Sequence, residues 1–194
     1  MLVIGAYDRE RARAYAERWA FDRNPLFTDF SGIGGNCTNF VSQCVYAGSC
    51  RMNFTPVFGW YYLDADDRAP AFTGVEYFYN FIVSNEGVGP FASEVTADAL
   101  TVGDVVQLGR EEGDYYHTLL VIGRDESGDL LIAAQSDDAY GRPLSSYTFA
   151  RARYLRIDGV RHSLGSVGDC YEPLLAGVEL MIEGAGRYIP AVTE

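Results

Sequence analysis

The sequence contains few of the residues on which common kinds of functional site depend. Only two histidines are present, and the four cysteines show neither a CxxC pair nor a His-rich spacing, so we expect no metal site and no cofactor. Fifteen basic residues against 27 acidic ones give a net charge of −12, which repels phosphate backbones, so we expect no nucleic-acid partner. No apolar run approaches the roughly 20 residues of a transmembrane helix, so we expect no membrane partner either.

The apolar start Met1–Ile4 is too short and lacks the basic flank of a signal peptide. We therefore expect no export signal in this chain, which fits a cytoplasmic, released or phage-associated protein and leaves the cell wall open. Cys37 and Cys44 lie about two helical turns apart, roughly 10 Å along one helix, which is beyond disulfide reach. We expect all four cysteines, which also include Cys50 and Cys170, to be reduced thiols, only one of them reactive.

The order of the predicted elements indicates an α+β domain. Helical spacing of apolar residues predicts helices over 8–21, 38–47 and 73–86, the second of them ending at Gly48. Short runs bounded by turn residues predict antiparallel strands over 103–108, 116–122, 130–135 and 150–157. This order is typical of N-terminal helices packed on an antiparallel sheet. Residues 1–157 should form the domain, and 158–194, with an apolar segment at 174–182, a C-terminal extension whose packing the sequence leaves open.

The block 34–43 (GGNCTNFVSQ) places a cysteine where a helix should begin. Two glycines permit a tight turn, Asn36 is a good N-cap, and Cys37 falls in the first helical turn. Unpaired N–H groups and the positive end of the helix dipole favour a thiolate there, which is the reactive form of the side chain. Cys37 is therefore a candidate nucleophile, and its N–H together with the Asn36 side chain would stabilise an oxyanion.

A thiol nucleophile needs a base within hydrogen-bond reach and a group that orients the base. His162 lies in a predicted loop with Gly and Ser, whereas His117 begins a strong strand and is the better candidate. With the next strand antiparallel and adjacent, Gln135 should lie near His117, where its carbonyl could accept the imidazole Nδ1–H. Asp137 and Asp138 are the competing orienting residues.

Aromatic side chains surround the predicted cysteine helix in the sequence. Phe30 precedes it, Trp60 and Tyr61 follow it in an irregular stretch over 50–72, and Tyr116 adjoins the candidate base. These four residues could line a substrate cleft, although such residues more often form a satellite core under a long loop.

Several blocks of the sequence resemble a known family. The runs are YDRERARAYAERWA, GGNCTNFVSQCVYAG, Trp60–Tyr61, GVEYFYNFI, GDVVQL, the strand from Tyr116 and AAQSDDAYGRPL. Together they cover about residues 7–157 and resemble the bacterial putative amidase domain family, which is similar to the CHAP and NlpC-type cysteine peptidases with a papain-like core. The resemblance implies a papain-like fold with Cys37 as nucleophile and His117 as base. Two departures are Asn36, where the family usually has Asp, and Gln135–Ser136, where it often has His-Thr or His-Ser.

These expectations combine into a cysteine-dependent amidase or peptidase. Cys37 would attack an amide carbonyl, His117 would protonate the leaving amine, and Gln135 would orient the ring. By resemblance the substrate is a peptide, in the stem or cross-bridge of peptidoglycan. One alternative is a non-catalytic module that binds wall glycopeptides through the loop around Trp60. Another is an intracellular hydrolase of small amides or γ-glutamyl peptides, and transacylation also fits the same residues.

Overall fold

The computed structural model describes residues 1–165, 168–182 and 188–190. Its helices are α1 (Arg9–Trp19), α2 (Cys37–Ser49), α3 (Pro70–Thr73), α4 (Val75–Ser84) and α5 (Tyr171–Ala176), with short 3-10 turns η1 (Ala97–Ala99) and η2 (Leu144–Ser146). Its strands are β1 (Leu2–Gly5), β2 (Gly89–Glu94), β3 (Val105–Gly109), β4 (Tyr115–Arg124), β5 (Leu130–Ala134), β6 (Ala139–Pro143), β7 (Arg151–Ser163), β8 (Glu179–Met181) and β9 (Tyr188–Pro190). None of the helices in these described ranges has the length and apolar character needed to cross a bilayer.

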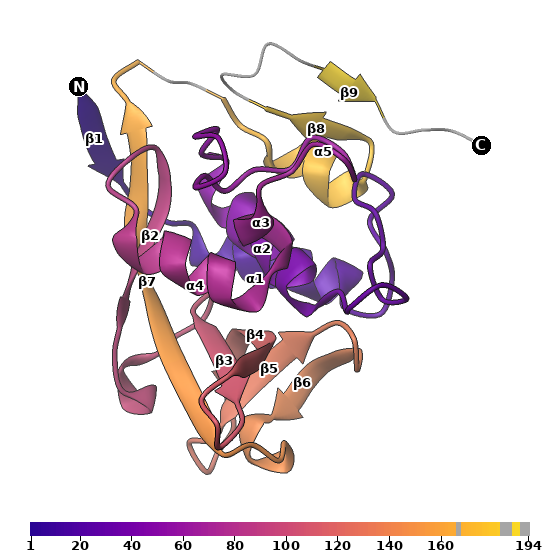
Figure 1. Ribbon diagram of the computed structural model, residues 1–194, viewed down its shortest axis with the longest axis vertical. Coiled ribbons are helices and arrows are strands. Elements are labelled where there is room, and N and C mark those ends of the chain that lie inside the picture. Colours follow the sequence, from indigo (N-terminus) through magenta and orange to yellow (C-terminus); the bar gives the residue numbers. More distant parts are fainter. Residues whose placement is uncertain (166–167, 183–187, 191–194) are drawn as a thin grey trace.

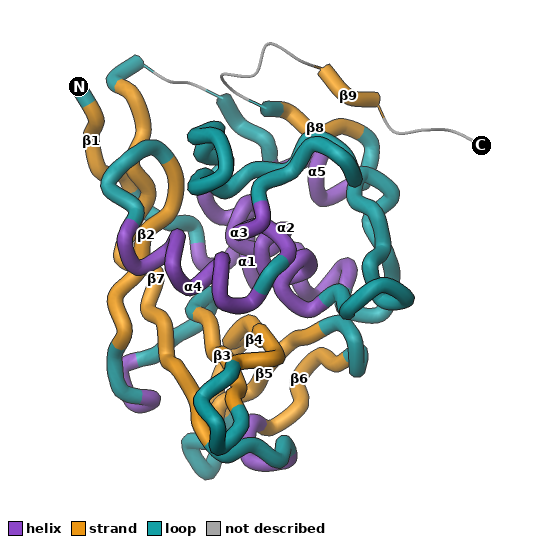
Figure 2. Tube along the Cα trace, viewed as in Figure 1, coloured by secondary structure: helices purple, strands orange, loops and turns teal. Residues whose placement is uncertain are grey.

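The predicted antiparallel sheet is confirmed, and its strands follow the order β1-β7-β3-β4-β5-β6, with β2 also paired to β7. Strand β7 is the longest, and it pairs with β3 through its first residues and with β2 and β1 farther along. In Figure 1 this strand runs along one side of the molecule, from the end that carries β3–β6 to the end that carries β1. Helices α1 to α4 gather in the centre, and Figure 2 shows the strands around them.

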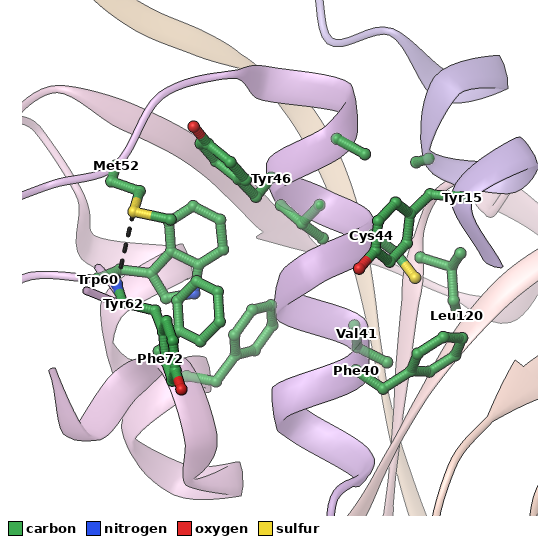
Figure 3. Close-up of a cluster of buried hydrophobic side chains, with 14 of the residues drawn as sticks. Tyr15, Phe40, Val41, Cys44, Tyr46, Met52, Trp60, Tyr62, Phe72 and Leu120 are labelled. Carbon is green, nitrogen blue, oxygen red and sulfur yellow. Dashed lines mark hydrogen bonds between the residues drawn. The ribbon is translucent and has the colours of Figure 1, made fainter. Parts of the chain in front are cut away.

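Two apolar clusters lie on the two faces of the sheet. On the helix side, Phe40 and Val41 of α2 pack in the same cluster as Leu120 of β4, as Figure 3 shows. On the other face, Leu119 of β4 packs with Ile132 of β5. Successive side chains of a strand point to opposite faces, so Leu119 and Val121 of β4 belong to one cluster and Leu120 and Ile122 to the other.

Helix α2 differs from the prediction at both ends. It begins at Cys37 and continues through Gly48 to Ser49, and Cys50 in the left-handed conformation (φ 48°) closes it by donating from its N–H to Tyr46 O at 2.7 Å. Gly48 does not end the helix but allows close packing against the segment before α1. A Cβ at this position would lie 2.4 Å from the ring of Tyr7 and 2.6 Å from Asp8 O, so only glycine lets the segment before α1 approach so closely.

The aromatic stretch 50–72 is largely core. The side chain of Trp60 is fully buried, donates from Nε1 to Ser42 Oγ at 3.0 Å, and packs 5.2 Å from the ring of Phe72. Figure 3 shows this group beside α2. The prediction that Trp60 lines a substrate cleft is therefore wrong, because the packing of this loop removes the indole from solvent.

The prediction of four reduced thiols is also wrong, since Cys50 and Cys170 form a disulfide. The spacing of Cys37 and Cys44 excluded only one pairing, and residues 120 positions apart in sequence cannot be paired by spacing arguments. The bridge attaches the region after 157 to the end of α2. Strand β7 itself runs through the predicted boundary at 157 to Ser163, and Leu174 of α5 is buried. The rest of the predicted extension at 166–167, 183–187 and 191–194 lies outside the described residues.

We predict that replacing Cys170 with serine will lower the free energy of unfolding by about 2 to 5 kcal/mol. The bridge closes a long loop, and the chain-entropy model gives such loops the largest stabilisation. Urea unfolding without reductant measures the change. Dithiothreitol should destabilise the wild-type protein by a similar amount and leave the Cys170→Ser variant unaffected. Equal midpoints for wild type and variant would contradict the prediction.

Candidate active site

Cys37 is the first residue of α2 and is 8% exposed. Gly34 and Gly35 lead into it with φ of 96° and 106°, a conformation that favours glycine. Among the described residues, the N–H groups of Cys37, Thr38 and Asn39 have no hydrogen-bond partner. The thiol therefore lies at the positive end of a helix dipole, beside backbone donors that remain available to an anion.

Asn36 occupies the N-cap position of this helix, as predicted, but its side chain makes no capping hydrogen bond. Its Oδ1 accepts from the N–H of Phe30 at 3.1 Å and from Asn39 Nδ2 at 2.8 Å, and its Nδ2 donates to Gln135 Oε1 at 2.5 Å. The carboxamide is thus engaged in cross-links between the preceding loop, the helix and the end of β5. An oxyanion at Cys37 would be held by the backbone N–H groups of the first turn.

One side-chain contact joins the start of α2 to the start of β4. Thr38 Oγ1 lies 2.9 Å from Thr118 Oγ1, and both hydroxyls are buried. The sulfur of Cys37 lies 3.9 Å from Thr38 Oγ1. The two threonines each follow one of the predicted catalytic residues, so this contact brings the elements that carry Cys37 and His117 together.

The imidazole of His117 lies on the other face of β4 from Thr118. Its ring is 6.4 Å from that of Tyr116, which occupies a bulge opposite β3, and 6.0 Å from that of Tyr147. Both tyrosines pack against the cluster of Leu119. Within the described ranges, no hydrogen bond joins Cys37 Sγ to the imidazole. The structure thus joins the two elements through their threonines, while no hydrogen bond of the described residues joins the thiol to the ring.

Burial controls the protonation of His117. It lowers the pKa of the imidazole to about 4, while the negative charge of Asp137 opposes the shift and the positive charge of Arg142 adds to it. Asp137 and Arg142 are themselves paired at 2.5 Å. At neutral pH the ring is therefore uncharged, which is the form that can accept a proton from a thiol.

Gln135 was predicted to orient His117, but its hydrogen bonds lead elsewhere. Nε2 donates to Trp19 O at 2.7 Å and Asp22 O at 2.8 Å, and Oε1 accepts from Asn36. The register of β4 and β5, which pairs Leu120 with Ala133, puts Gln135 on the helix side, opposite to the imidazole.

Asp137 and Asp138, the two alternative orienting residues, have different partners in the structure. Asp138 pairs with Arg23 at 3.0 Å, on the side of the loop that follows α1. Asp137 is the carboxylate whose charge acts on His117. Ser136, between Gln135 and Asp137, accepts from the N–H of Asn36 at 2.5 Å, a contact that no pattern in the sequence predicts. The only feature of the sequence that could have pointed to Ser136 is its position directly after Gln135.

The remaining cleft candidates do not meet in one place. Phe30 is buried under the guanidinium of Arg68, 4.4 Å from its ring centroid, and Tyr61 packs with Phe54 on the helix side. Tyr116 lies on the opposite face, beside a hollow of about 410 Å³ that Arg110, Phe149 and neighbouring residues line. A substrate bound near His117 would therefore contact Tyr116 before either of the others.

His162 is not in a loop as predicted. It lies in β7, paired with Val3 of β1, and its Nδ1 is 3.2 Å from Ser163 O. Strand pairing fixes it at the opposite end of β7 from β3, so it takes no part in the candidate site. Among the described residues, no three His, Cys, Asp or Glu side chains gather closely enough to hold a metal ion.

The depressed pKa of His117 predicts a pH-dependent stability. The pKa falls from 6.5 in the unfolded chain to about 4 in the folded one, so the unfolded chain binds the proton first as the pH falls. The stability that accompanies the neutral ring is present above about pH 6.5 and is lost between there and pH 4, about 3 kcal/mol in all. A His117→Gln variant should lose this dependence and a His162→Gln variant should keep it. Urea unfolding at several pH values measures both, and parallel curves for His117→Gln and wild type would contradict it.

The sequence of the chain matches a known protein family. The chain is a member of the family described as "Putative amidase domain", whose model matches residues 6–157. The description of this family points to the hydrolysis of amide bonds by its members. The chain is also 35% identical over 137 residues to a Bacillus subtilis (strain 168) protein described as "Uncharacterized protein YhbB". That alignment covers 69% of this chain and 42% of the relative, so the chain spans less than half of the relative's length. No solved structure matches the chain.

Proposed function

We propose that the protein is a cysteine amidase with a papain-like core of the NlpC/CHAP type, which hydrolyses an amide bond in peptidoglycan peptides. The observation that carries the proposal is Cys37 as the first residue of α2, with unpaired backbone donors around it, in a chain of an amidase family. This combination supplies a nucleophile and an oxyanion site at one point.

In the proposed reaction Cys37 is the nucleophile and His117 transfers the protons. The sulfur of Cys37 attacks the amide carbonyl while His117 takes the thiol proton, and the N–H groups of the first turn of α2 hold the oxyanion. The C–N bond then breaks, His117 gives its proton to the leaving amine, and a thioester remains on Cys37. Water, deprotonated by His117, hydrolyses the thioester to a carboxylate and regenerates the thiol.

The reaction requires the imidazole within hydrogen-bond reach of the sulfur. The Thr38–Thr118 contact joins the two elements that carry these residues. The proposal requires the ring, which lies on the face of β4 opposite to Thr118, to turn toward the sulfur when substrate binds. Asp137 is the proposed orienting residue in place of Gln135. Its negative charge favours the imidazolium that forms during attack.

The disulfide favours a substrate outside the reducing cytoplasm. Disulfides such as Cys50–Cys170 form and persist in oxidising compartments, which include the cell surface where peptidoglycan lies. An intracellular hydrolase of small amides would have no such need. A binding module that uses Trp60 also loses its basis, because that side chain is buried.

The test combines cleavage with labelling. Oxidised wild-type protein should release new amines and carboxylates from purified muropeptides, detected by mass spectrometry. Iodoacetamide should stop the release and modify Cys37, which is partly accessible, before Cys44, which is fully buried. Absence of cleavage at every amide, or cleavage that continues after Cys37 is alkylated, would refute the proposal.

A further inference from the structure

The turn between β5 and β6 forms two hydrogen bonds with Asn36, the residue before the proposed nucleophile. Gln135 Oε1 accepts from Asn36 Nδ2, and Ser136 Oγ accepts from the backbone N–H of Asn36, both at 2.5 Å. Asn36 is 1% exposed, and its carbonyl accepts from the N–H of Phe40 in α2. The peptide before Cys37 is therefore held from the backbone and from the side chain at once.

Gln135 can hold Asn36 in only one orientation. Its two amide hydrogens go to the carbonyls of Trp19 and Asp22 at the end of α1, so its oxygen must face the donor on Asn36. A flipped amide would set the Gln135 oxygen against two carbonyl oxygens and its nitrogen against another amide nitrogen. One buried side chain thus fixes the end of α1, the end of β5 and the start of α2 relative to each other.

The backbone of the same turn is strained. Ser136 and Asp137 have φ of 65° and 121°, which non-glycine residues rarely adopt and which persist only where surrounding contacts require them. A Cβ at position 35 would lie 3.4 Å from the Ser136 Oγ, so the hydroxyl lies close beside Gly35. In this conformation the hydroxyl accepts from the N–H of Asn36.

We propose that Gln135 and Ser136 are positioning residues for the nucleophile. They fix the peptide before Cys37, and with it the direction of the thiol and of the first-turn N–H groups, while His117 is oriented independently. This inference rests on the proposed function. The turn after β5 then has two separate roles. Gln135 and Ser136 position the nucleophile Cys37, and the next residue, Asp137, acts on the base His117.

The test uses Ser136→Ala and Gln135→Met. Ser136 is exposed and its replacement removes only one hydrogen bond to Asn36, so this variant should fold even where the second one does not. The matched control is Asp138→Asn, in the same turn but paired with Arg23 instead of Asn36. For each protein the measurements are the rate constant of Cys37 alkylation by iodoacetamide across pH, and kcat and KM for muropeptide cleavage.

We expect both test variants to lower kcat by about 10- to 100-fold with KM within about twofold, since small misplacements of a reacting group have effects of this size. The alkylation profile of Cys37 should change in both, and the control should match wild type. Unchanged alkylation in both variants, or a change confined to the imidazole limb of the pH–rate curve, would overturn the inference. If wild type cleaves no amide, the proposed function fails, while the alkylation profiles still decide whether the turn positions Cys37.

Discussion

Replacing Cys37 with alanine is expected to lower kcat/KM for amide cleavage by at least about 10³-fold, because the variant has no atom that can form the thioester. No other thiol can take its place. Burial raises the pKa of Cys44 well above its usual value, and Cys50 and Cys170 are bonded to each other. Only binding and the backbone donors of α2 would remain, which is why a small residual rate is expected.

Initial rates of amine release from muropeptides, at enzyme concentrations high enough to detect slow turnover, measure this loss. Cys44→Ala is the matched control, since it removes the other free thiol of the described chain, from the interior of the same helix. It should retain activity after correction for its lower stability. Comparable rates for Cys37→Ala and wild type would show that the cysteine is not the nucleophile.

Replacing His117 with glutamine is expected to lower kcat by about 10² to 10⁴-fold, the usual contribution of a general acid–base residue. The wild-type kcat/KM should fall in acid with a limb near the pKa of about 4 that burial gives the ring, well below that of an exposed histidine. In His117→Gln this limb should vanish together with most of the rate.

His162→Gln provides the matched control, because it removes the other histidine from a half-buried position on β7, away from the candidate site. Its kcat and pH profile should equal those of wild type. A His117→Gln enzyme with the wild-type acid limb would assign that limb, and the base, to another group. The stability change expected for the same variant is separable, since it follows from unfolding curves without substrate.

The spacing of apolar residues within a segment was enough to predict the helices and strands in which that spacing is regular. The helical spacing of Ala12, Tyr15 and Trp19 predicted α1, and the apolar runs predicted β3, β4 and β5 with small errors at the ends. Strands β2 and β6 contain proline, and β6 also has an internal glycine, residues that disfavour strands when read alone. They form because neighbouring strands complete their hydrogen bonds.

In the candidate site too, features with a local sequence pattern were predicted and features that depend on distant segments were not. The start of a helix at Cys37 follows from the glycines and the apolar pattern around it, so the sequence predicted it. The role of Gln135 depends on which face of β5 it occupies, and one residue along a strand reverses the face. Trp60 and the disulfide depend on contacts between distant segments, for which a single sequence carries no signal.

The pairing of β7 constrains the order in which the chain can fold as it is synthesised. Residues 2–5 in β1 find their partners only at 160–163, so the first strand must wait for most of the chain to be made. Such non-local pairing slows folding and leaves an unpaired edge exposed during translation. The family match ends at residue 157, before the partners of β1 are reached. A nascent chain of that length would hold α2 and β4, which carry the proposed catalytic residues, but could not yet pair β1 with β7.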